Sequence, residues 1–132
     1  MNLTNFNPAN YTRAHGSAPT ITLKEGGNIA FNSTAVRLLW GETIGEVYFQ
    51  LSANEETGGL YIAPFSTQSK DTFRAKVKDD HYGGCSVKSL VGELIKKYEL
   101  AVGNGRKKYV ALEIESKPVP VDNVDWFFIA TK

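Results

Sequence analysis

The chain contains few of the residues that mark several large classes of protein. Of its 132 residues one is cysteine, so Cys85 has no second cysteine for an internal disulfide. No apolar run approaches the roughly 18 residues that a membrane helix needs. The first residues lack the basic and apolar regions of a secretory signal. We therefore expect a soluble, cytoplasmic protein that does not contact membranes.

Neither sign of charge is in large excess. Fifteen basic residues face fourteen acidic ones, and the formal net charge is +1. Proteins that bind phosphate backbones without sequence preference are usually far more basic. The balance argues against strong non-specific binding of nucleic acid, but it leaves room for a local basic face. With 42% hydrophobic residues, a chain of this length is expected to bury one core.

Alternation of apolar and polar residues predicts a single, mainly β domain over residues 20–132, preceded by an irregular arm over 1–19. Strands are predicted near 20–24, 29–31, 47–51, 60–63, 73–77, 85–87, 110–114 and 126–130. Pro64 is expected to close the fourth strand. Residues 79–84 are expected to turn the chain, and residues 117–123 to form a loop.

Two short helices are expected between these strands. Asn32 or Ser33 can cap a helix over 35–40, which Gly41 ends. A second helix is indicated by an apolar stripe at helical spacing: Val87, Leu90, Val91, Leu94, Ile95 and Tyr98. The predicted fold class is therefore mixed, mainly β with one or two short helices (α+β).

The two halves of the domain, about 20–64 and 73–130, repeat one order of elements. Aligned side by side they share Ser33 with Ser89 and Leu38 with Leu94. One interpretation is an internal duplication that builds a pseudo-two-fold barrel from two strand-helix-hairpin halves. The alternative is coincidental similarity, because identical residues are few.

The first half carries motifs in a recognisable order. Residues 23–31 (LKEGGNIAF) are followed by the helix at 35–39, then by residues 44–49 (IGEVYF) and 60–62 (LYI). In this order, residues 20–64 resemble the swapped-hairpin family of AbrB- and MazE-like transcription factors and antitoxins. The resemblance implies an interlaced barrel, usually made by two chains, with Arg and Lys facing DNA.

The chain departs from this family in two respects. Asn32 stands where the family has a proline, and the first half offers only Lys24 and Arg37 as basic residues. If residues 73–130 are a diverged second copy, one chain could supply both halves of the barrel.

Basic residues are concentrated in the second half. Arg74, Lys76 and Lys78 alternate, so they project from one face of a strand, and Lys88 follows nearby. These four are the predicted nucleic-acid-binding residues, since such side chains contact phosphates. The alternative is that they are solvated charges that protect a sheet edge. Further basic residues lie at 96–97 and 106–108, and five aromatic residues could stack bases: Tyr48, Tyr61, Tyr98, Tyr109 and Trp126.

No constellation of residues indicates catalysis. His81 and Cys85 are four residues apart but lack further ligands or an orienting partner, so a polar turn and a buried thiol are the favoured interpretation. Glu113 and Glu115 are interpreted as the solvated side of a strand. The glycine pairs 26–27 and 83–84 lack phosphate-loop spacing and are attributed to turn geometry. We expect no enzyme activity, no metal and no cofactor.

Two functions remain as hypotheses. The first is a small non-enzymatic regulatory module, AbrB-like, whose partner is DNA. The alternative is a protein-interaction or accessory module, such as one from a mobile element, which does not bind DNA. The oligomeric state stays open, because an internal duplication could replace dimerisation.

Overall fold

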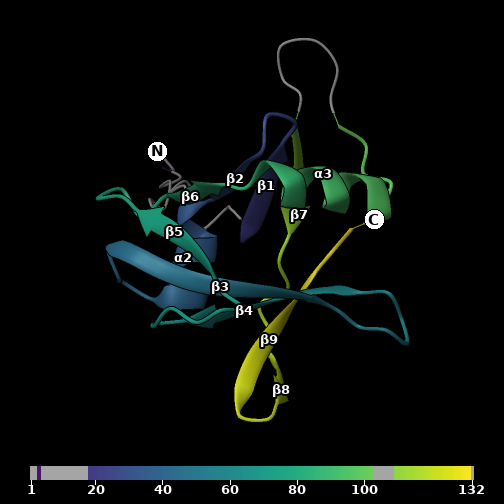
Figure 1. Ribbon diagram of the computed structural model, residues 1–132. Coiled ribbons are helices and arrows are strands. Elements are labelled where there is room, and N and C mark those ends of the chain that lie inside the picture. Colours follow the sequence, from purple (N-terminus) through teal and green to yellow (C-terminus); the bar gives the residue numbers. More distant parts are fainter. Residues whose placement is uncertain (1–2, 4–17, 103–108, 132) are drawn as a thin grey trace.

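The computed structural model of the protein describes residue 3 and residues 18–102 and 109–131. It consists mainly of antiparallel β-strands with two short helices, which confirms the predicted mainly β class (Figure 1). The strands are β1 (Thr20–Lys24), β2 (Asn28–Phe31), β3 (Gly45–Ala53), β4 (Leu60–Phe65), β5 (Phe73–Val77), β6 (Gly83–Ser86), β7 (Tyr109–Glu113), β8 (Val119–Val121) and β9 (Val124–Ile129). The helices are α2 (Ser33–Trp40) and α3 (Lys88–Lys97).

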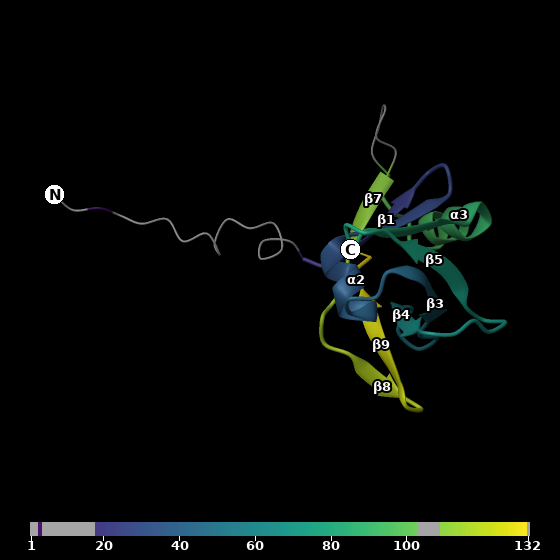
Figure 2. The ribbon, with the colours of Figure 1, turned by 90° about the vertical axis from the view of Figure 1, so that its left-hand side faces the viewer.

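The nine strands form one sheet in the order β7-β1-β2-β6-β5-β3-β4-β9-β8. The sheet curls into a half-barrel until the end of β7 reaches β9. There Ile114 and Ile129 form an isolated bridge, and the Glu115 amide donates a 2.8 Å hydrogen bond to the Phe128 carbonyl. The β8–β9 hairpin projects from the body of the sheet (Figures 1 and 2).

The strands of the two halves of the chain alternate around this sheet. The β3–β4 hairpin of the first half lies between β5 and β9 of the second, and β7 of the second half pairs with β1 of the first. The halves also meet directly where β2 pairs with β6, from Asn28↔Ser86 to Phe31↔Gly83. Neither half has a separate sheet.

The core lies on the inner face of the curled sheet, where alternate strand residues are buried. An aromatic cluster occupies one part of it. The ring of Phe31 lies 5.3 Å from that of Trp40 and 5.4 Å from that of Phe49, both edge-on, and Phe49 lies 5.5 Å from Phe73. The Trp40 indole N–H donates to the Tyr48 carbonyl at 3.0 Å, so its polar atom is satisfied.

Asn32 ties the first helix to the first strand. Its Oδ1 accepts hydrogen bonds from the Ala35 amide at 2.8 Å, as an N-cap, and from the Thr20 amide at 3.0 Å. Its Nδ2 donates to the Ala18 carbonyl at 2.7 Å. The capping role predicted for Asn32 or Ser33 therefore belongs to Asn32. The side chain explains why an amide suits this position, because a proline could make none of these three bonds.

Three expectations about turns need correction. Pro64 lies within β4, opposite Phe49, at the end where β4 has lost its pairing with β9, so its missing N–H costs no ladder bond there. Gly83 and Gly84 belong to β6 and not to a turn. Within residues 117–123, Val119–Val121 form β8, which a two-residue turn at Asp122 and Asn123 joins to β9.

The glycines of β6 are needed for packing. A Cβ on Gly84 would lie 3.0 Å from the Ile29 carbonyl oxygen, and one on Gly83 would lie 3.3 Å from a Val36 methyl group. Among the described residues of this β5–β6 connection, His81 has the positive φ, 64°. Close approach of neighbouring groups therefore explains this glycine pair better than turn geometry does.

We predict that Asn32→Ala destabilises the protein by about 2–3 kcal/mol, because it removes the helix cap and leaves the Thr20 amide without its acceptor. Asn32→Asp keeps a side-chain oxygen that can accept from both the Ala35 and the Thr20 amides, and it is expected to recover most of this loss. Chemical denaturation of the three proteins measures the free energy of unfolding. Ser33→Ala is the neighbouring control, with an expected change below about 0.5 kcal/mol; equal effects at positions 32 and 33 would contradict the assignment.

Candidate nucleic-acid interface

An open depression of about 510 Å³ lies on the outer face of the sheet, over β1, β2, β6 and the end of β5. Its rim carries three lysines, Lys24, Lys76 and Lys78. Among the described residues that line it, Asp80 is the acidic one, and its carboxylate accepts a 3.0 Å hydrogen bond from the Tyr82 amide. The local balance of charge is therefore positive although the chain as a whole is nearly neutral.

The floor of this depression is made of small residues. Ala30 of β2 pairs with Gly84 of β6, which in turn pairs with Lys76 of β5. Along the seam between β2 and β6, the next pair on this face of the sheet is Asn28 with Ser86, and both residues are exposed. Lysine, asparagine and serine side chains are among those that contact phosphate and sugar oxygens in nucleic-acid complexes. The low floor lets a ligand approach the strands themselves.

Lys88 is not among the residues that line this depression; it follows the lining residue Ser86 by two positions, at the start of α3. The Val87 amide donates to the Gly27 carbonyl at 2.9 Å, and Lys88 Cα lies 2.6 Å from the position of a Cβ on Gly27. The first residue of α3 is thus held against the β1–β2 turn, which begins at Lys24. We call Lys24, Lys76, Lys78 and Lys88 the basic face.

Lys88 is the first residue of α3. Val87 occupies the N-cap position without a side-chain hydrogen bond, and the first turn holds no acidic residue. Free amide groups and the helix dipole favour an anion at such an end. A lysine at this end of the helix works against helix stability.

Arg74 is exposed on β5, but it is partly neutralised. Its Nη1 lies 3.6 Å from Glu46 Oε1 on β3, and both side chains are more than half exposed. Of the four predicted binding residues, the structure places Lys76 and Lys78 at one depression, leaves Lys88 outside its lining at the start of α3, and pairs Arg74 with a carboxylate. Lys24 completes the rim. Alternation along β5 predicted that Lys76 and Lys78 are exposed on one face. Lys24 reaches the same depression because strands far apart in the sequence pair with one another.

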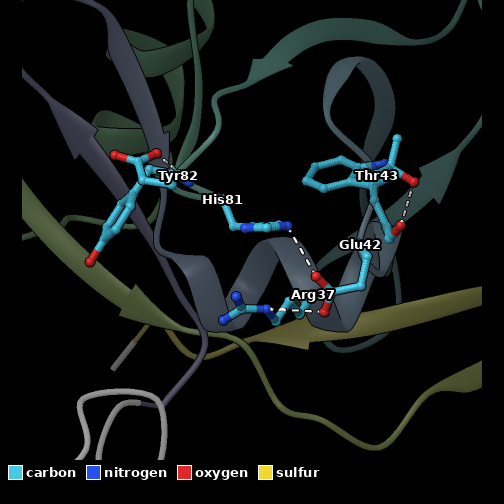
Figure 3. Close-up of polar contacts among 7 residues, drawn as sticks. Arg37, Glu42, Thr43, His81 and Tyr82 are labelled. Atoms are coloured by element: carbon cyan, nitrogen blue, oxygen red, sulfur yellow. Dashed lines mark hydrogen bonds and ion pairs between the residues drawn. The ribbon is translucent and has the colours of Figure 1, made fainter.

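His81 and Cys85 do not form a site together. His81 Nε2 lies 3.0 Å from Glu42 Oε2, and Arg37 Nε lies 3.2 Å from Glu42 Oε1 (Figure 3). This contact joins the end of α2 to the β5–β6 connection. Since Glu42 is largely exposed, such a pair contributes little to stability, commonly below 1 kcal/mol.

Cys85 lies on β6 opposite Ile29 and packs against the core. Burial raises the pKa of its thiol from 9.0 to about 11. The thiolate is the reactive form, so this cysteine is a poor nucleophile at neutral pH.

Two further hollows border Tyr98, near the end of α3 and the last residues of β9. The Tyr98 hydroxyl is buried and has no hydrogen-bond partner in the described part of the chain. Desolvation raises the pKa of this phenol, which keeps it neutral. Tyr98, the C-cap residue of α3, packs against the core.

The aromatic residues suggested for base stacking are scattered. Tyr48 lies on β3, Tyr109 on β7, and Tyr61 packs edge-on against Phe128 at 5.4 Å. None of them lines the lysine-rimmed depression, where Tyr82 is the aromatic residue. The basic segment at 106–108, the Asn-Gly pair at 104–105 that predicts a hairpin turn, and most of the N-terminal arm lie outside the described residues.

Within the described ranges, no three His, Cys, Asp or Glu side chains are grouped so that they could hold a metal ion. In the same part of the chain, no helix has the length and hydropathy required to cross a membrane. A scan against models of protein families found no match, and neither the curated proteins nor the solved structures gave a significant one.

We predict that Cys85 resists alkylation in the folded protein. A shift of the pKa from 9.0 to about 11 lowers the thiolate fraction at pH 8 roughly a hundredfold relative to an unperturbed thiol. Iodoacetamide labelling followed by mass spectrometry is unambiguous, since the chain has one cysteine. Concentrated guanidinium should restore ordinary labelling, and fast labelling without denaturant would contradict the prediction.

Proposed function

We propose that the protein is a small, non-enzymatic regulatory module that binds DNA through the basic face. The observation that carries this proposal is the arrangement of Lys24, Lys76 and Lys78 around one open depression. Among the described residues that line it, Asp80 is the acidic one, and its carboxylate already accepts a backbone hydrogen bond. Lysines on the rim provide the phosphate contacts, and Asn28 and Ser86 provide neutral hydrogen-bonding groups. Lys88 extends the positive region along α3.

The proposal includes an internal duplication, by which β1, β2, β3 and β4 correspond to β5, β6, β7 and β9. Strand pairing supports it. Under this correspondence the β1–β2 pair matches β5–β6, and the β3–β5 pair matches β7–β1. The β3–β4 pair corresponds to the single bridge between Ile114, just after β7, and Ile129 of β9. The β2–β6 and β4–β9 pairs each join two corresponding strands, so the correspondence only exchanges their members. Such a pattern is what an interlaced, AbrB-like barrel formed by one chain requires.

We predict salt-dependent binding of duplex DNA. Each phosphate contact contributes about 0.9 to the slope of log affinity against log salt concentration. The double variant Lys76→Gln/Lys78→Gln should lower this slope by about 2 and weaken binding at all salt concentrations. Arg74→Gln should have a smaller effect, because Glu46 already faces Arg74. Fluorescence anisotropy with a labelled duplex measures both quantities.

The control is Lys96→Gln/Lys97→Gln, which makes the same change of charge at the exposed C-terminal end of α3. It should leave the affinity nearly unchanged. A wild-type protein that binds no DNA at low salt, or binds with a slope near zero, would remove the proposal.

A second candidate function, a protein-interaction or accessory module, is favoured by the β8–β9 hairpin. Val119 and Val121 are 46% and 50% exposed. They share a face with Val124 and Trp126, their partners across the hairpin. An exposed apolar strip of this kind commonly marks a contact with another protein.

The free edge of this hairpin excludes one mode of contact. Val121 and Val124 flank a two-residue turn, so the backbone nitrogen and carbonyl of Pro120 point away from β9. The backbone nitrogen and carbonyl of Pro118, two residues earlier, point the same way. Neither proline has an N–H, so this edge cannot donate to an added strand. A partner would therefore be held by the valine side chains.

For this second candidate we predict that Val119→Ser/Val121→Ser abolishes capture of a partner from host extract. Lys76→Gln/Lys78→Gln should leave that capture intact. Affinity purification with quantitative mass spectrometry compares the two variants. Loss of the partner in the lysine variant, with retention in the valine variant, would count against this candidate and in favour of the basic face.

A further inference from the structure

The basic face contains a residue arrangement that repeats across the β2–β6 seam. One row of paired residues runs from Lys76 of β5 through Gly84 of β6 to Ala30 of β2. A second row runs from Lys24, at the end of β1, through Asn28 of β2 to Ser86 of β6. Each row thus starts at an outer lysine, crosses the inner strand beside it, and ends on the other inner strand.

A two-fold axis at the Ile29↔Cys85 pair would exchange these rows. The rotation carries the position of Asn28 onto that of Gly84, and the position of Ser86 onto that of Ala30. Gly84 and Ala30 are also paired between β6 and β2. The same rotation carries β1, beside β2, onto β5, beside β6. Lys24 and Lys76 then occupy equivalent positions on opposite sides of the depression that both of them line.

We propose that Lys24 and Lys76 are equivalent phosphate contacts, one on each strand of a single DNA duplex, so that one chain occupies one DNA site. This inference rests on the DNA-binding function proposed above and specifies its geometry. In this arrangement the seam faces the groove between the two backbones, and Lys78 and Lys88 extend the contacts outward. No second copy of the chain is needed to complete the site.

The spacing of the two lysines suits this role. Three strand spacings separate β1 from β5, and the rows are offset by two residues along the strands. With about 4.8 Å between strands and 3.3 Å per residue, the two Cα atoms lie roughly 16 Å apart. The major groove of B-DNA is about 12 Å wide, so lysines at this distance reach the phosphates on its two sides.

The floor between the lysines is suited to close approach. Ala30 and Gly84 carry little or no side chain, and Asn28 and Ser86 offer an amide and a hydroxyl group. The short side chains leave space for a base edge or sugar, while the longer polar ones can form hydrogen bonds to it. Replacing Gly84 by a larger residue would push against the Ile29 carbonyl, 3.0 Å from the new Cβ.

The test compares Lys24→Gln with Lys76→Gln in the full chain, using a labelled duplex and anisotropy across salt concentrations. Each variant should lower the salt slope by about 1, and the two affinities should agree within about twofold. Lys96→Gln is the matched control and should change neither quantity. Circular dichroism checks that each variant keeps the fold, which is expected because both lysines are exposed.

Stoichiometry provides the second measurement. Light scattering coupled to size-exclusion chromatography should give one chain per short duplex. If Lys76→Gln weakens binding and Lys24→Gln does not, or if two chains occupy the duplex, the equivalence is overturned while DNA binding stands. Absence of DNA binding by the wild-type chain would overturn the proposed function itself. Capture of an acidic protein instead of DNA by the same lysines would overturn both.

Discussion

The pairing of β2 with β6 is the constraint on which the rest of the structure depends. It joins the two halves of the chain, and it does so at a distance that only small residues permit. Gly84 lies where any Cβ would press on the Ile29 carbonyl, and Gly83 lies against Val36 of α2. Inside this seam lie Ile29 and Phe31. The same pairing therefore supports the core on one face and leaves a low floor on the other.

The second long-range constraint is the insertion of strands from one half of the chain between strands of the other half. β3 and β4 lie between strands of the second half, and β7 lies beside β1. Each half thus depends on the other for its strand partners, and the inner apolar faces are buried only when both are present. This arrangement also places basic residues from β1 and from the end of β5 around one depression, although Lys24 and Lys78 are 54 positions apart in the sequence.

Most of the individual elements could be predicted from local patterns. Alternation located nearly every strand, and the Asn32 and Gly41 signals correctly bounded α2. The errors share one cause, which is that local residue preference was outweighed by pairing. Gly83 and Gly84 were expected to turn the chain but are required by a close neighbour. Pro64 was expected to end a strand, yet it is tolerated where one side of β4 is unpaired. Val119–Val121 were assigned to a loop because prolines surround them.

The candidate site was predictable only in part. Lys76 and Lys78 follow from the period of one strand, but their association with Lys24 depends on the order of strands in the sheet, which no local pattern contains. The weakening of Arg74 has the same origin, since Glu46 reaches it from the neighbouring strand. Charge composition could not reveal the basic face either, because a nearly neutral total conceals how the charges are distributed.

The pairing of β1 with β7 also bears on how the chain is made. Leu23 lies opposite Val110, 87 positions later in the sequence, and Ile21 lies opposite Leu112. During synthesis from the N-terminus, β1 therefore has one of its two neighbours missing until most of the chain has left the ribosome. Contacts of such long sequence separation form slowly, because the entropy cost of closing a large loop comes before the contact stabilises the chain. The nascent first half spends this interval with an unpaired strand edge and a core that only the last strands complete.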